Sequence, residues 1–174
     1  MNTLDAIIKR KGVRNFTDEQ LSKDKLKTLI HAANTAAISG GGRPDSDSAR
    51  QITVVQNLDV LNSINATIEK SIGLPNALYN AKTLIIVSAP KNQYGAEQLD
   101  CALAVQNIAL AATDMSLNSI IMTAPLYAIN MNEDLKNNLN LPEGFTPYLC
   151  ICVGYTNDTS IKTREYIDTN VNYI

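Results

Sequence analysis

The stretch that decides the fold is Asp100–Asp114, which has the sequence DCALAVQNIALAATD. Between the two aspartates it contains no charged residue, no Gly and no Pro, and polar side chains occur only at positions 106, 107 and 113. A helix that is apolar on every side has to be buried on every side. The stretch is shorter than the roughly 20 apolar residues that cross a bilayer. We therefore predict a central helix, packed either inside a large core or between two subunits.

Length and charge narrow the class of protein. The chain has 174 residues, which predicts one domain spanning 1–174 with a sizeable core. A formal net charge of -2 gives no general attraction to nucleic acid or to an anionic membrane, so we expect neither as a partner. The sequence has no signal-peptide pattern and no transmembrane stretch, and we expect a cytoplasmic protein.

Cysteine and histidine give no indication of a metal site or a catalytic triad. Cys150 and Cys152 alternate within an apolar run, which predicts small core residues on a strand. We expect them to face opposite sides of that strand and therefore not to share a metal ion. His31 is the only histidine, and it has no Cys or carboxylate at ligand spacing. We expect it to be a surface or satisfied core residue.

The segments around the central stretch show helical and strand patterns in turn. Further helices are predicted over 2–11, 23–37, 58–72 and 131–139. Buried or half-buried strands are predicted over 51–56, 84–89, 119–125 and 148–155. Asn2 or Thr3 can cap the first helix, and Ser22 can cap the second. The polar tail 156–174 has too little apolar surface for a core of its own, so we expect it to dock elsewhere.

A basic segment follows the first helix, with cations at 9, 10, 11 and 14 around Gly12. It is open to two interpretations. Basic residues suit the last turn of a helix and can simply be solvated there. Alternatively, Arg10 and Arg14 bind a phosphate together with turn amides that Gly12 exposes.

The stretch 39–48, SGGGRPDSDS, is the most irregular in the chain. Its composition predicts a loop, and no Gly-Lys-Ser/Thr ends it, so it is not a Walker loop. Loops of this kind are either disordered or carry ligand contacts.

The order of these features resembles the nitroreductase family of flavoproteins over nearly the whole chain. Residues 8–16, IKRKGVRNF, are similar to the family's R-R-S-x-R-x-F segment, which holds the phosphate and ribityl chain of FMN. Residues 100–112 resemble the family's long interface helix, and 141–155, from LPEG to the strand ending in VGY, are also typical. Lys162-Thr163-Arg164 falls where the family places a late basic pair on the same phosphate.

This resemblance implies an α+β fold in which helices flank a mixed β-sheet. It also implies an intertwined homodimer, with the tail 155–174 docked on the partner and FMN in a cleft between the subunits. The cofactor-binding residues that it implies are Arg10, Lys11, Gly12, Arg14, Ser46, Ser48, Thr123, Ala124, Lys162 and Arg164.

The sequence departs from the family pattern at three places. The family's P-S-x-x-N-x-Q-P-W loop is replaced by Pro44–Gln51, without the Asn or the Pro-Trp. Gly12 stands where the family has a phosphate-site Ser, so the backbone donor remains and the hydroxyl is lost. Thr123-Ala124 stands where many members carry Glu-Gly beside flavin N5, a contact that is largely made by the main chain.

The implied activity is a ping-pong transfer of electrons from NAD(P)H to a nitroaromatic or quinone-type acceptor. The flavin carries the chemistry, so no side chain is expected to act as a catalytic acid or base. Two alternatives remain open. The first is an FMN-binding protein with little turnover, serving as a flavin carrier or sensor, and the second is a flavin-free interaction module. The sequence does not choose between NADH and NADPH, and it does not identify the physiological acceptor.

Overall fold

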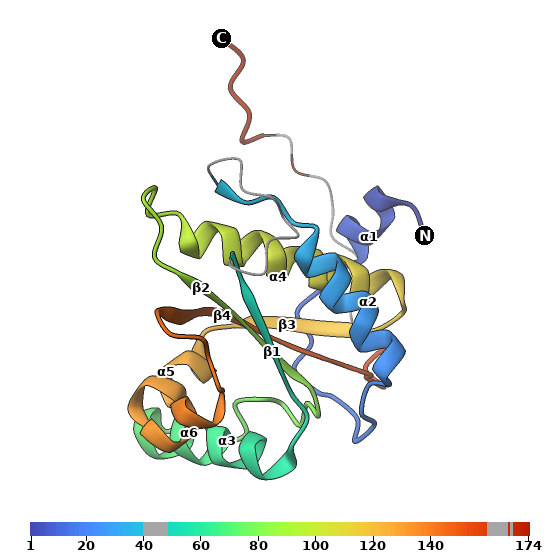
Figure 1. The fold of residues 1–174 in the computed structure, drawn as a ribbon. Helices are drawn as coiled ribbons and strands as arrows, with labels where there is room; N and C mark the ends of the chain where they lie inside the picture. Colours follow the sequence, from blue (N-terminus) through green and yellow to red (C-terminus); the bar gives the residue numbers. More distant parts are fainter. Residues whose placement is uncertain (40–48, 160–166, 168) are drawn as a thin grey trace.

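The structure is a computed structural model that describes residues 1–39, 49–159, 167 and 169–174. Ten helices and strands form within the described residues (Figure 1). In chain order they are α1 (Thr3–Lys9), α2 (Lys23–Asn34), β1 (Gln51–Val55), α3 (Leu58–Ile72), β2 (Leu84–Pro90), α4 (Glu97–Asp114), β3 (Asn118–Met122), α5 (Ala124–Met131), α6 (Glu133–Asn138) and β4 (Phe145–Gly154).

The described strands form one four-stranded sheet in the order β1-β2-β4-β3. Every pair of neighbouring strands is antiparallel, so the prediction of a mixed sheet is wrong for these four strands. A parallel contact is nevertheless present, as a bridge between Gly12 and Ser119 on the outer edge of β3. Among the described residues, the sheet becomes mixed through this N-terminal segment.

Helices cover both faces of the sheet, with α1, α2 and α4 above it and α3, α5 and α6 below it (Figure 1). Alternate residues of the central strands supply the two cores. Ile85 and Val87 pack with α2 and α4, whereas Leu84 and Ile86 pack with the lower helices. Because both faces are covered, β2 is apolar nearly throughout, as its sequence predicted.

Cys150 and Cys152 correct one sequence-based expectation. Both thiols are fully buried, as predicted, but both belong to the core below the sheet. The expectation that they face opposite sides is wrong, because residues two apart on a strand return to the same face. Their partners are apolar, and within the described residues no group of three or more His, Cys, Asp or Glu side chains could hold a metal ion.

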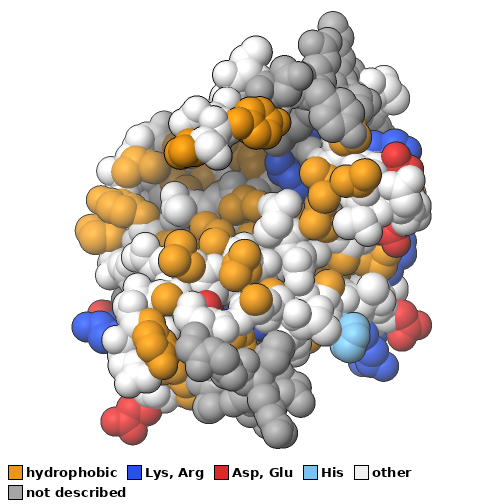
Figure 2. Space-filling view, turned by 90° about the horizontal axis from the view of Figure 1, so that it is seen from above, with side chains coloured by type: hydrophobic (Ala, Val, Ile, Leu, Met, Phe, Trp, Pro, Cys, Tyr) orange, Lys and Arg blue, Asp and Glu red, His pale blue; other side chains and the backbone are white. Residues whose placement is uncertain are grey.

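Helix α4 is buried on its inner side and open on its outer side. Val105 and Ala109 are fully buried against the sheet, but Leu99 and Leu103 remain 67% and 47% exposed. Burial inside one large core, the first alternative for this helix, is therefore wrong. Figure 2, which looks down on the helical layer from above, shows hydrophobic side chains spread over this face. Leu4 of α1 is also exposed, at 65%.

The region after β3 differs most from the sequence prediction. The strand ends at Met122, and Ala124 begins helix α5, with Pro125 in its first turn. Proline suits that position because its missing N–H has no intrahelical partner there. Asn132 separates α5 from α6 and caps α6, since its side chain accepts from Asp134 N and Leu135 N at 3.1 and 3.2 Å. The predicted helix over 131–139 is thus the shorter α6, and a separate helix, α5, replaces the end of the strand predicted over 119–125.

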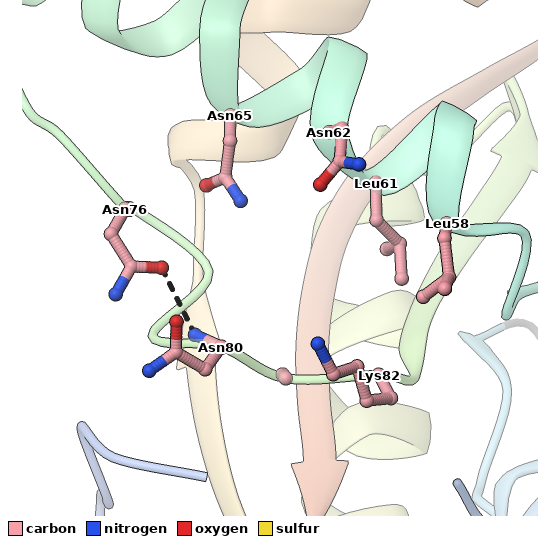
Figure 3. A pocket seen from close by; sticks show the side chains of 8 residues that line it. Leu58, Leu61, Asn62, Asn65, Asn76, Asn80 and Lys82 are labelled. Atoms are coloured by element: carbon pink, nitrogen blue, oxygen red, sulfur yellow. Dashed lines mark hydrogen bonds between the residues drawn. The ribbon is translucent and has the colours of Figure 1, made fainter. Parts of the chain in front are cut away.

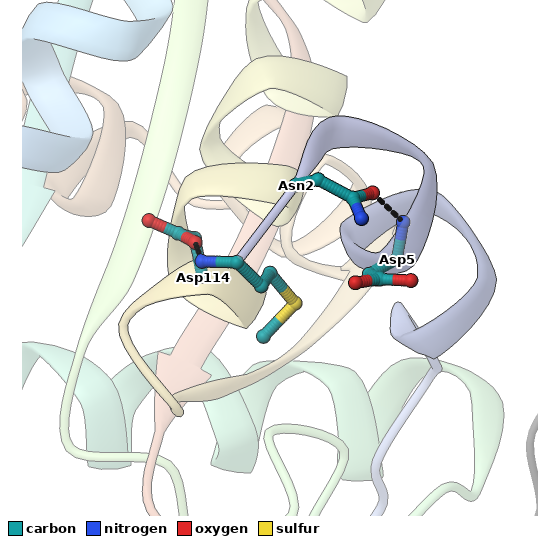
Figure 4. A network of polar contacts seen from close by, with 4 residues as sticks. Asn2, Asp5 and Asp114 are labelled. Atoms are coloured by element: carbon teal, nitrogen blue, oxygen red, sulfur yellow. Dashed lines mark hydrogen bonds and ion pairs between the residues drawn. The ribbon is translucent and has the colours of Figure 1, made fainter.

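The predicted caps are confirmed at the N-terminal helices. The Asn2 side chain accepts a hydrogen bond from Asp5 N at 2.9 Å, and Ser22 accepts one from Lys25 N at 3.4 Å. The amino group of Met1 pairs with Asp114 at the end of α4, which ties α1 to the central helix (Figure 4). No helix among the described residues is long and apolar enough to cross a membrane.

Candidate functional site

The basic segment that follows α1 is fastened to the sheet by one residue. Val13 is buried, and its N–H donates to the carbonyl oxygen of Ser119 at 3.1 Å. The residues on either side remain accessible: Lys11 is half-buried, and Gly12 and Arg14 are exposed. Arg10 ends α1 as its C-cap and is half-buried. The cationic groups therefore lie along the outer edge of β3, near its start.

Strand β3 links this basic segment to the second predicted contact. Thr123 directly follows the strand, and it is exposed, while Ala124 is half-buried. Ser119 and Thr123 are four residues apart on an extended chain, which corresponds to about 13 Å. The structure thus brings Arg10–Arg14 and Thr123–Ala124 to one strand, at its opposite ends. The other predicted site residues, Ser46, Ser48, Lys162 and Arg164, lie outside the described residues.

The basic segment has the chemistry of an anion site. Guanidinium and ammonium groups give charge-assisted hydrogen bonds to phosphate oxygens, which are stronger than bonds between neutral groups. The bridge to β3 uses the N–H of Val13, so the N–H of Gly12 is not one of its donors. A Cβ atom at Gly12 would meet Ile120 Cγ1 at 3.9 Å, an ordinary contact. The backbone therefore has room for a serine at this position.

A buried polar cluster at the start of α4 was not predicted from the sequence. Arg50 is 7% exposed, and its guanidinium donates to the carbonyl oxygens of Asn34, Ala36, Ala37 and Asp100 at 2.8 to 3.4 Å. The Asn34 carbonyl belongs to the last turn of α2, where backbone acceptors lack intrahelical partners, and those of Ala36 and Ala37 follow directly after the helix. The Asp100 carboxylate accepts from both N and Oγ of Ser39, at 2.9 and 2.8 Å. Asp100 thus fixes Ser39 and Arg50, the residues flanking the predicted ligand loop.

Burial shifts the pKa values around this cluster. Burial lowers the pKa of Arg50, although Cys101 and Asp100 nearby raise it. Burial also raises the pKa of Cys101 to about 12, with Arg50 opposing the shift. A thiol held so far from ionisation is a poor nucleophile, and we assign Cys101 to packing.

A cavity of about 380 Å³ lies between α3 and the segment before β2 (Figure 3). Amide side chains dominate its lining, but they have structural roles. Asn65 Oδ1 accepts from Leu78 N at 2.9 Å, and Asn76 Oδ1 accepts from Asn80 N at 3.0 Å. Asn76 and Asn80 also adopt positive φ angles, which asparagine tolerates better than most residues. The amides shape a turn, and the cavity is remote in sequence from the predicted flavin contacts.

Comparison with known proteins shows the family. The model of the nitroreductase family matches residues 48–155, which is more than half of the chain. The chain belongs to this family.

Individual relatives have low sequence identity to this chain, but the matches cover most of its length. A protein of Archaeoglobus fulgidus, provisionally named NADH dehydrogenase/NAD(P)H nitroreductase, is 25% identical over 89% of this chain and 86% of its own. The FMN reductase (NADPH) of Bacillus subtilis is 22% identical over 92% of this chain and 68% of its own. A nitroreductase with bound FMN from Desulfitobacterium hafniense superposes with a TM-score of 0.83 at 25% identity, covering 100% of this chain and 99% of that chain.

Proposed function

We propose that this protein is an FMN-dependent oxidoreductase that passes electrons from NAD(P)H to a nitroaromatic or quinone-type acceptor by a ping-pong mechanism. FMN is the cofactor named for the structural relative from Desulfitobacterium hafniense, and NADPH and FMN both occur in the name of the Bacillus subtilis relative. When bound, FMN supplies the hydride chemistry, and the protein supplies binding and orientation.

The observation that carries this proposal is the bridge between Gly12 and Ser119. Because of it, a cationic segment suited to a phosphate and an exposed backbone turn at Thr123 lie at the two ends of one edge strand. An elongated cofactor with a phosphate at one end and a flat ring at the other fits such an arrangement.

The chain's own residues would divide the work between the two ends. Arg10, Lys11 and Arg14, joined by Lys162 and Arg164, offset the phosphate charge, and the N–H of Gly12 donates to it. The main chain at Thr123 and Ala124 would contact flavin N5, and Ser46 and Ser48 would contact the ring. No side chain of this set acts as acid or base, so substrate protons come from solvent.

We also propose that 1–174 is a single FMN-binding domain that works as a cytoplasmic homodimer. The support is apolar surface that one protomer does not cover. Leu99 and Leu103 form an exposed row on α4, and in the tail Ile167 and Tyr173 are 75% and 91% exposed. Residues 169–174 extend away from the body of the molecule (Figure 1). Docking of the tail 155–174 on a second copy would bury both surfaces.

A flavin carrier or sensor with little turnover is the second candidate function. One observation favours it: Thr123 has no carboxylate where many family members have one. The two functions predict different rates from the same flavin-loaded protein.

The test is an anaerobic absorbance titration of the purified protein loaded with FMN. We expect NADH or NADPH to bleach the flavin band, and a quinone added afterwards to restore it over many turnovers. Bleaching without repeated turnover would instead support the carrier or sensor. A protein that does not retain FMN would exclude both.

A further inference from the structure

Helix α5 presents an aromatic side chain to solvent immediately after the predicted flavin contact. Pro125, Ala128 and Ile129 form its buried side, whereas Tyr127 is 45% exposed and Met131 is 63% exposed. Large apolar side chains that stay exposed in the protomer are candidates for contacts with a ligand. Tyr127 is therefore a candidate for contact with a ligand.

Helix geometry directs the Tyr127 ring toward Thr123. Residues four apart lie on the same side of a helix, so Tyr127 is one turn beyond Thr123 on one face. Side chains in a helix lean toward its N-terminus and cover the preceding turn. With a rise of 1.5 Å per residue, Tyr127 lies about 6 Å along the axis from Thr123, and Met131 lies about 12 Å away. Tyr127 can reach a molecule at Thr123, whereas Met131 is a full turn too distant.

We propose that Tyr127 is a specificity-determining residue, whose ring stacks on the ring of an aromatic acceptor held at the Thr123 end of the site. The proposal rests on the proposed function, because it needs the flavin ring at that end. It deepens that function by selecting flat, conjugated ring acceptors, such as quinones and nitroaromatics, over oxidants that have no such ring. Offset or edge-to-face pairs of aromatic rings add binding energy beyond the area that they bury.

The reaction balances for either class of acceptor. With a quinone, NAD(P)H and one proton give NAD(P)⁺ and the hydroquinone. With a nitroaromatic, NAD(P)H and one proton give NAD(P)⁺, the nitroso compound and water. Tyr127 exchanges no proton or electron in these steps, and its contribution is to bind and orient the acceptor.

The first experiment measures binding without turnover. Calorimetry on the FMN-loaded protein would compare benzoate with cyclohexanecarboxylate, which has the same charge and nearly the same size but no aromatic ring. We expect Tyr127→Leu to weaken benzoate about twofold to tenfold, the range that an aromatic pair contributes, and to leave cyclohexanecarboxylate unchanged. Tyr127→Phe should keep the preference, and Met131→Leu, on the same face one turn further, is the matched control.

The second experiment measures selectivity in turnover. The ratio of kcat/KM for 1,4-naphthoquinone to that for ferricyanide should fall about twofold to tenfold in Tyr127→Leu and stay unchanged in Tyr127→Phe and Met131→Leu. The affinity for FMN and the mass in light scattering should be the same for all variants.

Each contrary result overturns the inference. Equal benzoate affinity in Tyr127→Leu and the unmodified protein would remove Tyr127 from the acceptor site while leaving the flavin function intact. A changed mass in Tyr127→Leu would assign the ring to a subunit contact. Failure of the unmodified protein to bind FMN at all would overturn the proposed function, and this inference with it.

Discussion

Arg50 and Arg14 carry the same guanidinium group in opposite surroundings. Two apolar side chains of α4, Val105 and Leu103, show the same contrast. Arg50 is buried and donates to carbonyl oxygens of its own protomer, whereas Arg14 is exposed at the edge of β3. Val105 is fully buried, whereas Leu103 is 47% exposed. Groups on the inner side have partners within the protomer and hold the fold together. Groups on the outer side are available for a ligand or a second subunit.

The largest effect should separate the two sides of α4. Val105→Asp places an unpaired charge in the core and should cost more than about 4 kcal/mol of unfolding free energy, enough to block folding. Leu103→Asp should leave the protomer core intact and shift the mass from dimer to monomer. Circular dichroism and light scattering on both variants test this. A stable monomer of the unmodified protein would contradict the proposed dimer.

Removal of the Arg50 side chain should cost about 3–5 kcal/mol of unfolding free energy, because buried carbonyl groups lose their donor. Arg14→Ala should cost no more than about 0.5 kcal/mol, since its side chain is exposed. Chemical denaturation of both variants measures the difference. Arg50→Lys is the informative control, because it keeps the charge but cannot span several carbonyls. Equal losses of unfolding free energy for Arg50→Ala and Arg14→Ala would contradict the assignment of a structural role to Arg50 alone.

For FMN affinity we expect Arg14 to matter more than Arg50, the reverse of their order in stability. Arg14→Ala, Arg10→Ala and Arg164→Ala should each weaken FMN by on the order of 1.5–3 kcal/mol, roughly tenfold to a hundredfold. Losses in double variants should not simply add, since one anion is shared. Riboflavin, which lacks the phosphate, should bind weakly and with the same affinity in every variant. If Arg164→Ala affects FMN and riboflavin equally, the tail does not hold the phosphate.

The buried thiols should make the protein sensitive to alkali. Burial raises the pKa of Cys152 from 9.0 to about 12, so the thiol stays protonated in the folded protein while it ionises in the unfolded chain. The resulting stability is present below pH 9 and is lost as the pH rises toward 12. The loss is about 1.4 kcal/mol per pH unit. Denaturation curves at pH 8, 9 and 10 should show a shallower decline for Cys152→Val, whose packing cost does not depend on pH.

The smallest expected effect is a gain in FMN affinity. Gly12→Ser restores the hydroxyl that the family usually has beside the phosphate, and the structure has room for its Cβ atom. We expect FMN to bind about 1 kcal/mol more tightly, roughly fivefold, and riboflavin to bind as before. Gly12→Ala is the control for the added Cβ, and equal FMN affinities of the Ser and Ala variants would show that the hydroxyl has no partner.

Sequence patterns predicted the helices and strands whose apolar side chains recur at a regular spacing. The helix predicted over 58–72 from its apolar spacing has the same limits as α3. In the structure the Asn57 side chain caps its start, and Gly73 ends it in a left-handed conformation. Helix α5 was missed because Ala124 and Pro125 extend the apolar run of β3. The proline was the available signal, since it suits the first turn of a helix. The contacts of Arg50 could not be predicted, because all four partners lie 13 to 50 residues away and no spacing rule links them. At the candidate site, the composition of residues 9–14 indicated the basic segment, but its attachment to Ser119 depends on the folded sheet.

The strand order has a consequence for the synthesis of the chain. β4 is made after the other three described strands, yet it lies between β2 and β3 in the finished sheet. While a ribosome is still translating residues 145–154, β1 and β2 can already pair, but β3 has no neighbouring strand, and the inner edge of β2 is bare. Unpaired edges and uncovered apolar faces are the features that make nascent chains stick to one another. The centre of the sheet therefore cannot close until β4 has been made, and until then the apolar faces of β2 and β3 lack their central strand.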